Sequence, residues 1–160
     1  MKKIIAAVLL CTTFATPAFA EGSPYYAGAQ LGDSYVGVFG GYQIDKMYSV
    51  EIHYLDFDSA SFPGPARSIN VSSIGVSGVA MFPMKLNKVP PFALFAKLGV
   101  ERTTAKITSA TPAFNYTAHD TDLILGGGAQ YDFNNKVSAR LGLDIAGEAD
   151  SLYLSAILKF

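Results

Sequence analysis

Hydrophobic and polar residues alternate along most of the chain from residue 25 onward. A period of two is typical of β-strands, in which successive side chains point to opposite faces. Turn-forming Gly, Pro, Asn, Asp and Ser residues separate the alternating blocks. The pattern predicts eight strands, at approximately 25–31, 36–43, 48–54, 73–82, 92–101, 122–131, 137–145 and 152–160.

One face of every predicted strand lacks charged residues. In the last strand, for example, Leu152, Leu154 and Leu158 occupy alternate positions. The opposite face combines many glycines with the charged residues of the strands, which are Glu51, His53, Lys97, Glu101, Asp122, Arg140, Asp144 and Lys159.

A sheet with one apolar face fits either a soluble barrel or sandwich, or a membrane barrel whose apolar face contacts lipid. If the chain starts in the periplasm, seven of the eight periplasmic strand ends on the apolar face are aromatic, and only Val137 departs. Aromatic side chains are enriched where a barrel meets the membrane interface. The pattern therefore favours the membrane barrel, with a periplasmic aromatic girdle of Tyr25, Tyr42, Tyr48, Phe82, Phe92, Tyr131 and Phe160.

The composition supports this choice. The chain has 160 residues, of which 50% are hydrophobic and 16% charged, which excludes a disordered chain. A membrane helix needs about 20 mostly apolar residues. The two longest uncharged runs, 4–20 and 68–84, have 17 residues each, and the second is rich in serine and glycine. The high hydrophobicity is thus distributed over strands rather than concentrated in a helix.

The N-terminus has the features of a secretory signal peptide. Lys2 and Lys3 precede an apolar stretch at 4–10, and small residues at 18–20 predict cleavage between Ala20 and Glu21. We therefore expect a signal peptide at 1–20 and one barrel domain at 21–160. The single cysteine, Cys11, lies in the signal peptide, so no disulfide is expected. The remaining 10 basic and 13 acidic residues give no basic surface for nucleic acid.

The C-terminal residues 152–160, with apolar residues at every second position back from Phe160, look like the assembly signal of bacterial outer-membrane barrels. Segments 36–42 and 50–54 resemble strands of the outer membrane protein A-like and opacity-like family. This resemblance implies an all-β, eight-stranded antiparallel transmembrane up-and-down β-barrel in the cell outer membrane. It also implies assembly, as a monomer, by periplasmic chaperones and the barrel assembly machinery, with Leu158 and Phe160 carrying the signal.

The charged residues of the inward face predict a charge network in the lumen. Charges buried in a narrow lumen must pair to persist. The candidates are Glu51, Lys97, Glu101, Arg140 and Asp144. The family resemblance implies that Glu51, Lys97 and Arg140 are counterparts of an acid–base network that plugs such barrels. Two interpretations remain: a packed plug, which the narrow interior of eight strands favours, and a gate for small ions.

Catalysis is the main alternative to a structural or surface-interaction role. Some barrels of this size modify lipid A with a histidine, a serine and an acid, and the deacylases carry a His-x-Ser-Asn pattern. The two histidines here, His53 and His119, do not match that pattern, and His119 is followed by Asp120. We therefore expect no enzyme activity, no cofactor and no metal site.

The predicted outer loops at 55–72 and 102–121 are rich in Ser, Thr, Ala and Pro. Loops of such barrels usually carry the interaction with other molecules. They predict contact with a host surface, a phage or lipopolysaccharide through exposed aromatic residues such as Phe62, Phe114 and Tyr116. Arg67, Arg102 and Lys106 lie near the expected outer rim, where they are candidates for pairing with lipid phosphates.

Overall fold

The computed structural model describes residues 23–57, 60–62, 67–84, 92–109, 115–147 and 149–160. Within these residues all regular structure is β-strand, and no helix is long and apolar enough to cross a membrane. The nine described strands are β1 (Tyr25–Gly32), β2 (Tyr35–Gln43), β3 (Tyr48–Phe57), β4 (Ala60–Phe62), β5 (Arg67–Met84), β6 (Phe92–Ser109), β7 (Tyr116–Asp132), β8 (Val137–Ala146) and β9 (Ala149–Lys159).

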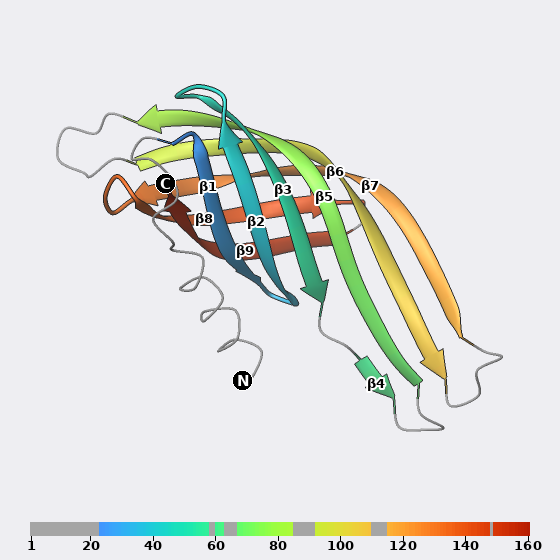
Figure 1. Ribbon diagram of the computed structural model, residues 1–160. Coiled ribbons are helices and arrows are strands. Elements are labelled where there is room, and N and C mark those ends of the chain that lie inside the picture. The colour runs from blue at the N-terminus through green and yellow to red at the C-terminus, as the bar shows by residue number, and fades with distance from the viewer. Residues whose placement is uncertain (1–22, 58–59, 63–66, 85–91, 110–114, 148) are drawn as a thin grey trace.

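The strands form a closed, antiparallel up-and-down barrel. Apart from the short β4, each strand pairs with the strands next to it in the chain, and β3 pairs with β5. β1 pairs with β9, for example Ala29 with Ala156, which closes the sheet (Figure 1). The short β4 continues β3, because both pair with β5. The barrel wall therefore has eight strand positions, which we call staves, because β3 and β4 share one of them. This is the number of strands that the alternation predicted. Closure leaves no free sheet edge where the barrel crosses the membrane.

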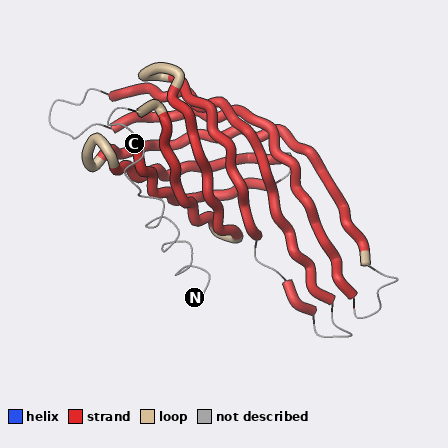
Figure 2. Tube along the Cα trace, in the orientation of Figure 1, coloured by secondary structure: helices blue, strands red, loops and turns tan. Residues whose placement is uncertain are grey.

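Strands β5, β6 and β7 are longer than the others and extend past them at one end, as the trace in Figure 2 shows. They contain 18, 18 and 17 residues, whereas a tilted membrane strand needs only about 9 to 11. The loops predicted at 55–72 and 102–121 are therefore wrong in extent, since most of these residues are paired strand. Outside the lipid both faces are polar, so the alternation disappears while the β-propensity of residues such as Thr103 and Ile107 remains.

The burial of side chains along the strands follows the predicted alternation. In β3, Val50, Ile52 and Tyr54 are exposed while Glu51 and His53 between them are buried. The same alternation places the predicted apolar face outward in every stave. An outward surface of this kind is stable in lipid and not in water.

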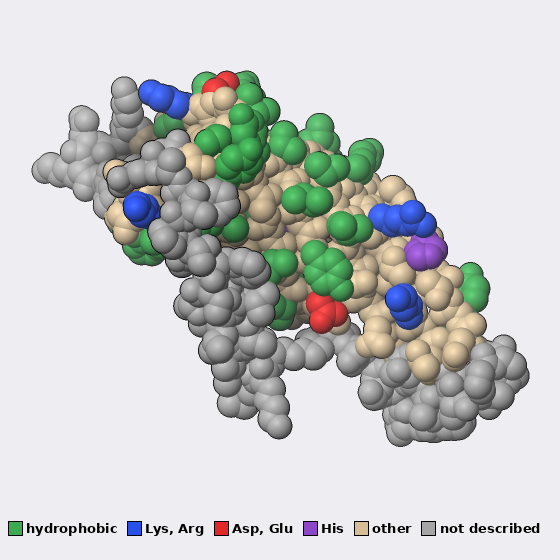
Figure 3. Space-filling view, viewed as in Figure 1, with side chains coloured by type: hydrophobic (Ala, Val, Ile, Leu, Met, Phe, Trp, Pro, Cys, Tyr) green, Lys and Arg blue, Asp and Glu red, His purple; other side chains and the backbone are tan. Residues whose placement is uncertain are grey.

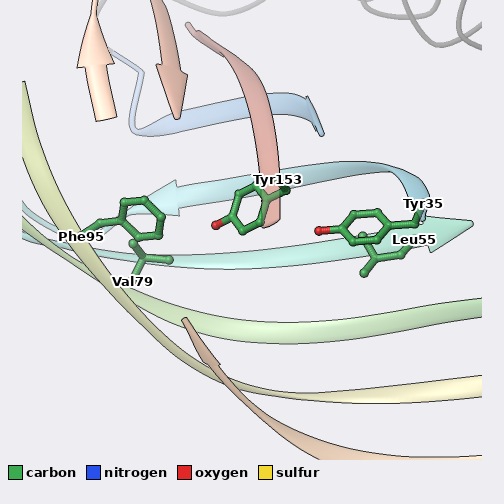
Figure 4. Close-up of a cluster of buried hydrophobic side chains, with 5 residues drawn as sticks. All are labelled: Tyr35, Leu55, Val79, Phe95 and Tyr153. Carbon is green, nitrogen blue, oxygen red and sulfur yellow. The ribbon is translucent and has the colours of Figure 1, made fainter. Parts of the chain in front are cut away.

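Aromatic and aliphatic side chains fill much of the barrel interior, which the sequence did not predict. One cluster comprises Tyr35, Leu55, Val79, Phe95 and Tyr153. In Figure 4, Phe95 lies against Val79, Tyr35 lies against Leu55, and Tyr153 lies between these two pairs. A second cluster comprises Tyr26, Phe39 and Ile157. The lumen thus contains aromatic and aliphatic clusters as well as polar side chains.

Glycines on the inward face make room for these large side chains. Gly41 is the direct cross-strand partner of Tyr26, and Gly28 is the partner of Phe39. Gly142 is paired with Tyr153, and a Cβ at Gly142 would lie 2.6 Å from the ring carbon Cζ of that tyrosine. The alternation of small and large residues lets the narrow interior close-pack.

Side-chain hydrogen bonds fix two of the tight turns at the periplasmic end. Asp45 Oδ1 accepts from the main-chain N–H groups of Met47 and Tyr48, at 2.7 and 2.8 Å. Asn134 Oδ1 accepts from those of Lys136 and Val137, both at 2.8 Å. This turn chemistry is the usual reason for Asp and Asn at such positions. Residues 85–91, which connect β5 to β6 at the same end, lie outside the described residues.

Candidate functional site: ionic clusters in the lumen

The five predicted network residues all point into the lumen. Glu51 lies on β3, Lys97 and Glu101 on β6, and Arg140 and Asp144 on β8. Glu51 and Arg140 are each 4% exposed, and Lys97 is 6% exposed. Charges removed from water to this degree persist only with close partners.

Arg140 and Glu51 form an ion pair that crosses the lumen. Arg140 Nη1 lies 2.7 Å from Glu51 Oε1. Four steps along the sheet separate β3 from β8 in either direction, so these strands face each other across the eight-stave barrel. Tyr26 also donates its hydroxyl to Glu51 Oε1 at 2.8 Å, and the Arg140 Nη2 group donates to Gln130 Oε1 at 3.1 Å. The pair therefore belongs to a hydrogen-bonded layer across the barrel.

Two aromatic rings complete this layer. The Arg140 guanidinium carbon lies 4.8 Å from the centroid of Phe95 and 5.8 Å from that of Phe39. Both distances are within the range of cation–π attraction. We call Arg140, Glu51, Gln130, Phe39 and Phe95 the central layer of the lumen.

A second ion pair joins Lys97 of β6 to Asp144 of β8 through Nζ and Oδ2. The Lys97 ammonium also lies 5.4 Å from the ring centroid of Tyr153. The other carboxylate oxygen of Asp144 is buried and accepts no hydrogen bond from the described residues. This pair therefore supplies a second ionic contact inside the barrel.

Glu101 joins a third cluster. Its Oε2 accepts from the Ser73 hydroxyl at 3.0 Å and lies 3.4 Å from His53 Nε2. The structure thus groups the five predicted residues into two ion pairs and a Glu101–His53–Ser73 cluster. His53 was predicted to face the lumen, but the alternation gave no signal that Glu101 would be its partner.

Cavities lie on both sides of the central layer. The outer cavity, of about 590 Å³, is lined by acidic and basic residues that include His53, Lys97, Glu101, Asp120 and Asp144. The inner cavity, of about 110 Å³, is lined by Arg140, Tyr26, Asp132 and Lys159 among others. Lys159 Nζ and Asp132 Oδ1 form an ion pair of 2.8 Å at this periplasmic mouth. Arg140 therefore lies between the inner cavity and the rest of the lumen.

The residues of the predicted aromatic girdle lie at one end of the barrel. Tyr25 and Tyr42 are direct cross-strand partners, with ring centroids 5.2 Å apart. Tyr25, Tyr42, Tyr48 and Phe82 are exposed on the outward surface, and Phe92, Tyr131 and Phe160 are half-buried. Their role at a membrane interface stays a prediction.

The two other predicted signals lie at the chain ends. The cleavage residues Ala20 and Glu21 lie outside the described residues. Leu158 is paired with Ala27 on β1 and with Val137 on β8, and the Phe160 main-chain N–H donates to the Tyr25 carbonyl at 3.2 Å. The C-terminal segment thus takes part in closing the barrel.

The second histidine has a different environment. His119 is exposed on the outward side of β7, where its Nδ1 lies 3.1 Å from Thr104 Oγ1. Its neighbour Asp120 instead lines the outer cavity. In the part of the chain that the structure describes, no group of three or more His, Cys, Asp or Glu side chains is arranged to hold a metal ion.

A closed antiparallel barrel with an apolar outward face and a packed, ion-paired lumen defines the class of outer-membrane β-barrels. The family model described as the outer membrane protein beta-barrel domain matches residues 6–152. The chain belongs to this family and is a protein of the outer membrane, which confirms the resemblance predicted from its strands.

Solved structures agree with this assignment. The chain is similar to the N-terminal barrel of Pseudomonas aeruginosa OprF, with a TM-score of 0.67 and 15% identity over 88% of this chain and 100% of that one. Neisserial surface protein A gives a TM-score of 0.62 at 15% identity, with the same coverage. The Yersinia pestis outer membrane protein Ail in a nanodisc gives 0.54 at 13%, over 85% and 98%. The search of curated proteins finds no match.

Proposed function

We propose that this protein is a non-catalytic outer-membrane barrel whose lumen is closed to ions and whose outer end interacts with molecules at the cell surface. The observation that carries the proposal is the Arg140–Glu51 ion pair, which crosses the lumen between two aromatic rings. An interior of eight staves has room for side chains and little else. A packed layer of this kind blocks a continuous water path.

The polar groups of the lumen support packing rather than catalysis. Glu101 accepts from Ser73 and lies beside His53, so the carboxylate occupies the centre of the cluster. Nucleophilic catalysis needs the histidine between the serine and the acid. Ser73 is also 1% exposed and faces the lumen, away from membrane lipid. These features argue against a lipid A-modifying enzyme.

The outer end of the barrel is the proposed interaction surface. Strands β5 to β7 extend past the other staves there and expose side chains such as Tyr116, which is 65% exposed. A host-surface or phage ligand is the expected partner at this end. Periplasmic chaperones and the barrel assembly machinery are the expected partners during assembly.

Ion conductance tests the closed lumen. We expect the wild-type barrel to be nearly silent in a planar lipid bilayer and Arg140→Ala to conduct, because this substitution removes the pair that spans the lumen. Breaking a buried ion pair also costs about 3–5 kcal/mol, so the temperature of heat modification on detergent gels should fall.

Lys136→Ala, in the turn between β7 and β8 at the periplasmic end, is the matched control for removing a basic residue, because Lys136 is exposed and lines neither of the two cavities. We expect it to behave as the wild type in both measurements. A wild-type barrel that conducts steadily would instead favour the small-ion channel, with the two cavities as its vestibules. Unchanged conductance and stability in Arg140→Ala would remove the support for a plug held by this pair.

A further inference from the structure

The outer half of β7 has a strand partner on one side only. Residues 116–123 pair with β6 throughout. On the other side, pairing with β8 begins only at Ile124, opposite Ala146. Among the described residues no strand pairs with this side of 116–123, which we call the free edge of β7. It is about 25 Å long and forms one border of the extension made by β5, β6 and β7 (Figure 1).

Main-chain hydrogen-bonding groups point out of the sheet along the free edge. Those of successive residues in a strand point to opposite sides. The main-chain N–H of Thr121 donates to Asp120 Oδ1 at 2.8 Å, so it points away from β6. The N–H and C=O groups of Thr117 and His119 point to the same side, because these residues are an even number of positions from Thr121. An exposed row of this kind is a template for a further strand.

The free edge lies outside the lipid. Along the outward face of β7, the exposed residues Leu125 and Leu123 are followed by Thr121, His119 and Thr117. Figure 3 shows hydrophobic side chains over the barrel wall and Lys, Arg and His side chains toward the end of the extension. At the opposite border of the extension, β4 pairs with β5 and supplies a further strand. The free edge of β7 is therefore in water, where another polypeptide can reach it.

The inward face beside the free edge is acidic. Asp120 and Asp122 of β7 line the outer cavity, together with Glu101 and Asp144. Lys97, which pairs with Asp144, is the one Lys or Arg among the described residues of this lining. Side chains directly opposite each other on neighbouring strands lie about 5 Å apart. A strand added to the free edge would thus place its inward side chains beside Asp120 and Asp122.

The outward face has the opposite charge. Arg102 and Lys106 are exposed there on β6, the strand next to β7. Basic residues that face inward, alternating with uncharged residues that face outward, are therefore complementary to both faces. A second copy of β7 is not complementary, because it would bring Asp120 and Asp122 beside their own equivalents, and like charges across a strand pair are destabilising.

We propose that the free edge of β7 binds an extended segment of a partner protein that carries Lys or Arg at every second position. The main chain of this segment continues the sheet through hydrogen bonds to Thr117 and His119, and its basic side chains face Asp120 and Asp122. Main-chain bonds supply affinity in such strand addition, and alternate side chains supply specificity. The proposal rests on the proposed interaction at the outer end and names the chemistry of the partner.

Binding of a synthetic peptide to the detergent-purified barrel, measured by fluorescence anisotropy, tests the charge complementarity. The probe is a fluorescent peptide of alternating Lys and Thr residues, as long as the free edge. We expect the double variant Asp120→Asn, Asp122→Asn to bind it at least about tenfold more weakly than the wild type. The matched control Asp56→Asn, Asp150→Asn removes the same charge from exposed outward positions and should bind as the wild type.

Methylated peptides test the main-chain bonds. Methyl groups on the main-chain nitrogens of either all Thr or all Lys residues block one edge of the peptide and leave its charge unchanged. Only one edge of an added strand pairs with β7. We therefore expect one methylated peptide to bind at least about tenfold more weakly and the other to bind as the unmodified peptide.

Heat modifiability on detergent gels shows in parallel that each variant is folded. Equal binding by the two double variants, or equal binding of all three peptides, would overturn the proposal. A wild-type barrel that dimerises in detergent and binds no peptide would show that the edge pairs with a second copy, and would overturn the basic partner.

Adherence of cells that produce the barrel to a layer of host cells measures the surface interaction itself. Adherence that persists in the Asp120→Asn, Asp122→Asn variant would leave the surface interaction intact and overturn the free edge as its site. Loss of adherence in this variant but not in its control is the expected result. None of these measurements depends on conductance, so the free edge and the proposed function can fail separately.

Discussion

At the scale of the residue, Arg140 has the most completely defined environment in the lumen. Its guanidinium pairs with Glu51, donates to Gln130 and lies over two phenylalanine rings. A planar group with five donors can make all these contacts at once, whereas a lysine ammonium cannot stack in the same way. The ion pair, the hydrogen bonds and the ring contacts together offset the free-energy cost of burying the charge.

The sequence identified the inward charged residues but not their partners. The side of the sheet to which a side chain points follows from the period of two along a single strand, so the sequence alone places Glu51 and Arg140 in the lumen. Which residues meet depends on the stagger between strands and on which staves lie opposite, and the alternation contains neither. The aromatic interior has a related cause, because the alternation along one strand does not show that Phe95 and Tyr153 lie opposite glycines, Gly128 and Gly142, on the neighbouring strands.

The small residues of the lumen give a prediction about packing. A Cβ at Gly28 would lie 2.6 Å from the main-chain oxygen of Ala156 and against the ring of Phe39. Because a main-chain atom cannot move aside cheaply, Gly28→Ala should lower the free energy of unfolding by about 1–3 kcal/mol. Urea-induced unfolding in lipid vesicles measures this change.

Gly40→Ala is the matched control for this substitution. Gly40 is on the neighbouring strand and faces outward, where the nearest atom to a new Cβ is 4.0 Å away. We expect this variant to unfold as the wild type does. Equal stability of the two variants would contradict the close packing described for the lumen.

At the scale of the element, the extent of β5, β6 and β7 shows where the sequence signal ends. Their membrane halves alternate clearly, and the predicted strands at 73–82, 92–101 and 122–131 lie inside the observed ones. Their outer halves pair just as regularly, from Arg67 with Ser109 onward. The main-chain hydrogen bonds of the sheet continue in these outer halves, where no face contacts lipid. Hydrophobic alternation therefore indicates which part of a strand crosses the membrane, and does not indicate where the strand ends.

Strand β9 is the element that closes the barrel, and its last residues carry the predicted assembly signal. We expect Phe160→Ala to reduce the amount of folded barrel in the outer membrane of cells. Leu152→Ala, at the other end of the same apolar face, should have less effect. The heat-modifiable fraction of isolated outer membranes measures both.

The structure also predicts that this defect concerns assembly rather than stability. Phe160 follows the last residue of β9 and makes a main-chain hydrogen bond to Tyr25, which an alanine retains. Purified Phe160→Ala should therefore still refold in detergent, because the main-chain hydrogen bonds that close the barrel remain. Failure to refold there, or a normal amount in cells, would argue against an assembly signal at this position.

At the scale of the whole molecule, hydrophobic side chains occupy both surfaces of the barrel. The outward surface is apolar because it contacts lipid, and the lumen contains aromatic clusters because an eight-stave interior must be filled. The sequence therefore predicted the outer surface and the topology well. It described the interior only through its charges, since aromatic residues on a mostly polar face gave no separate periodic signal.

The Arg140–Glu51 ion pair is the proposed closure of the lumen. Exchanging the two charges, with Glu51→Arg and Arg140→Glu in one barrel, tests it most directly in a planar bilayer. We predict that each single reversal conducts, because like charges then face each other across the lumen, and that the exchanged pair returns to low conductance. An exchanged pair that conducts as strongly as the single variants, or single variants that stay silent, would contradict the claim.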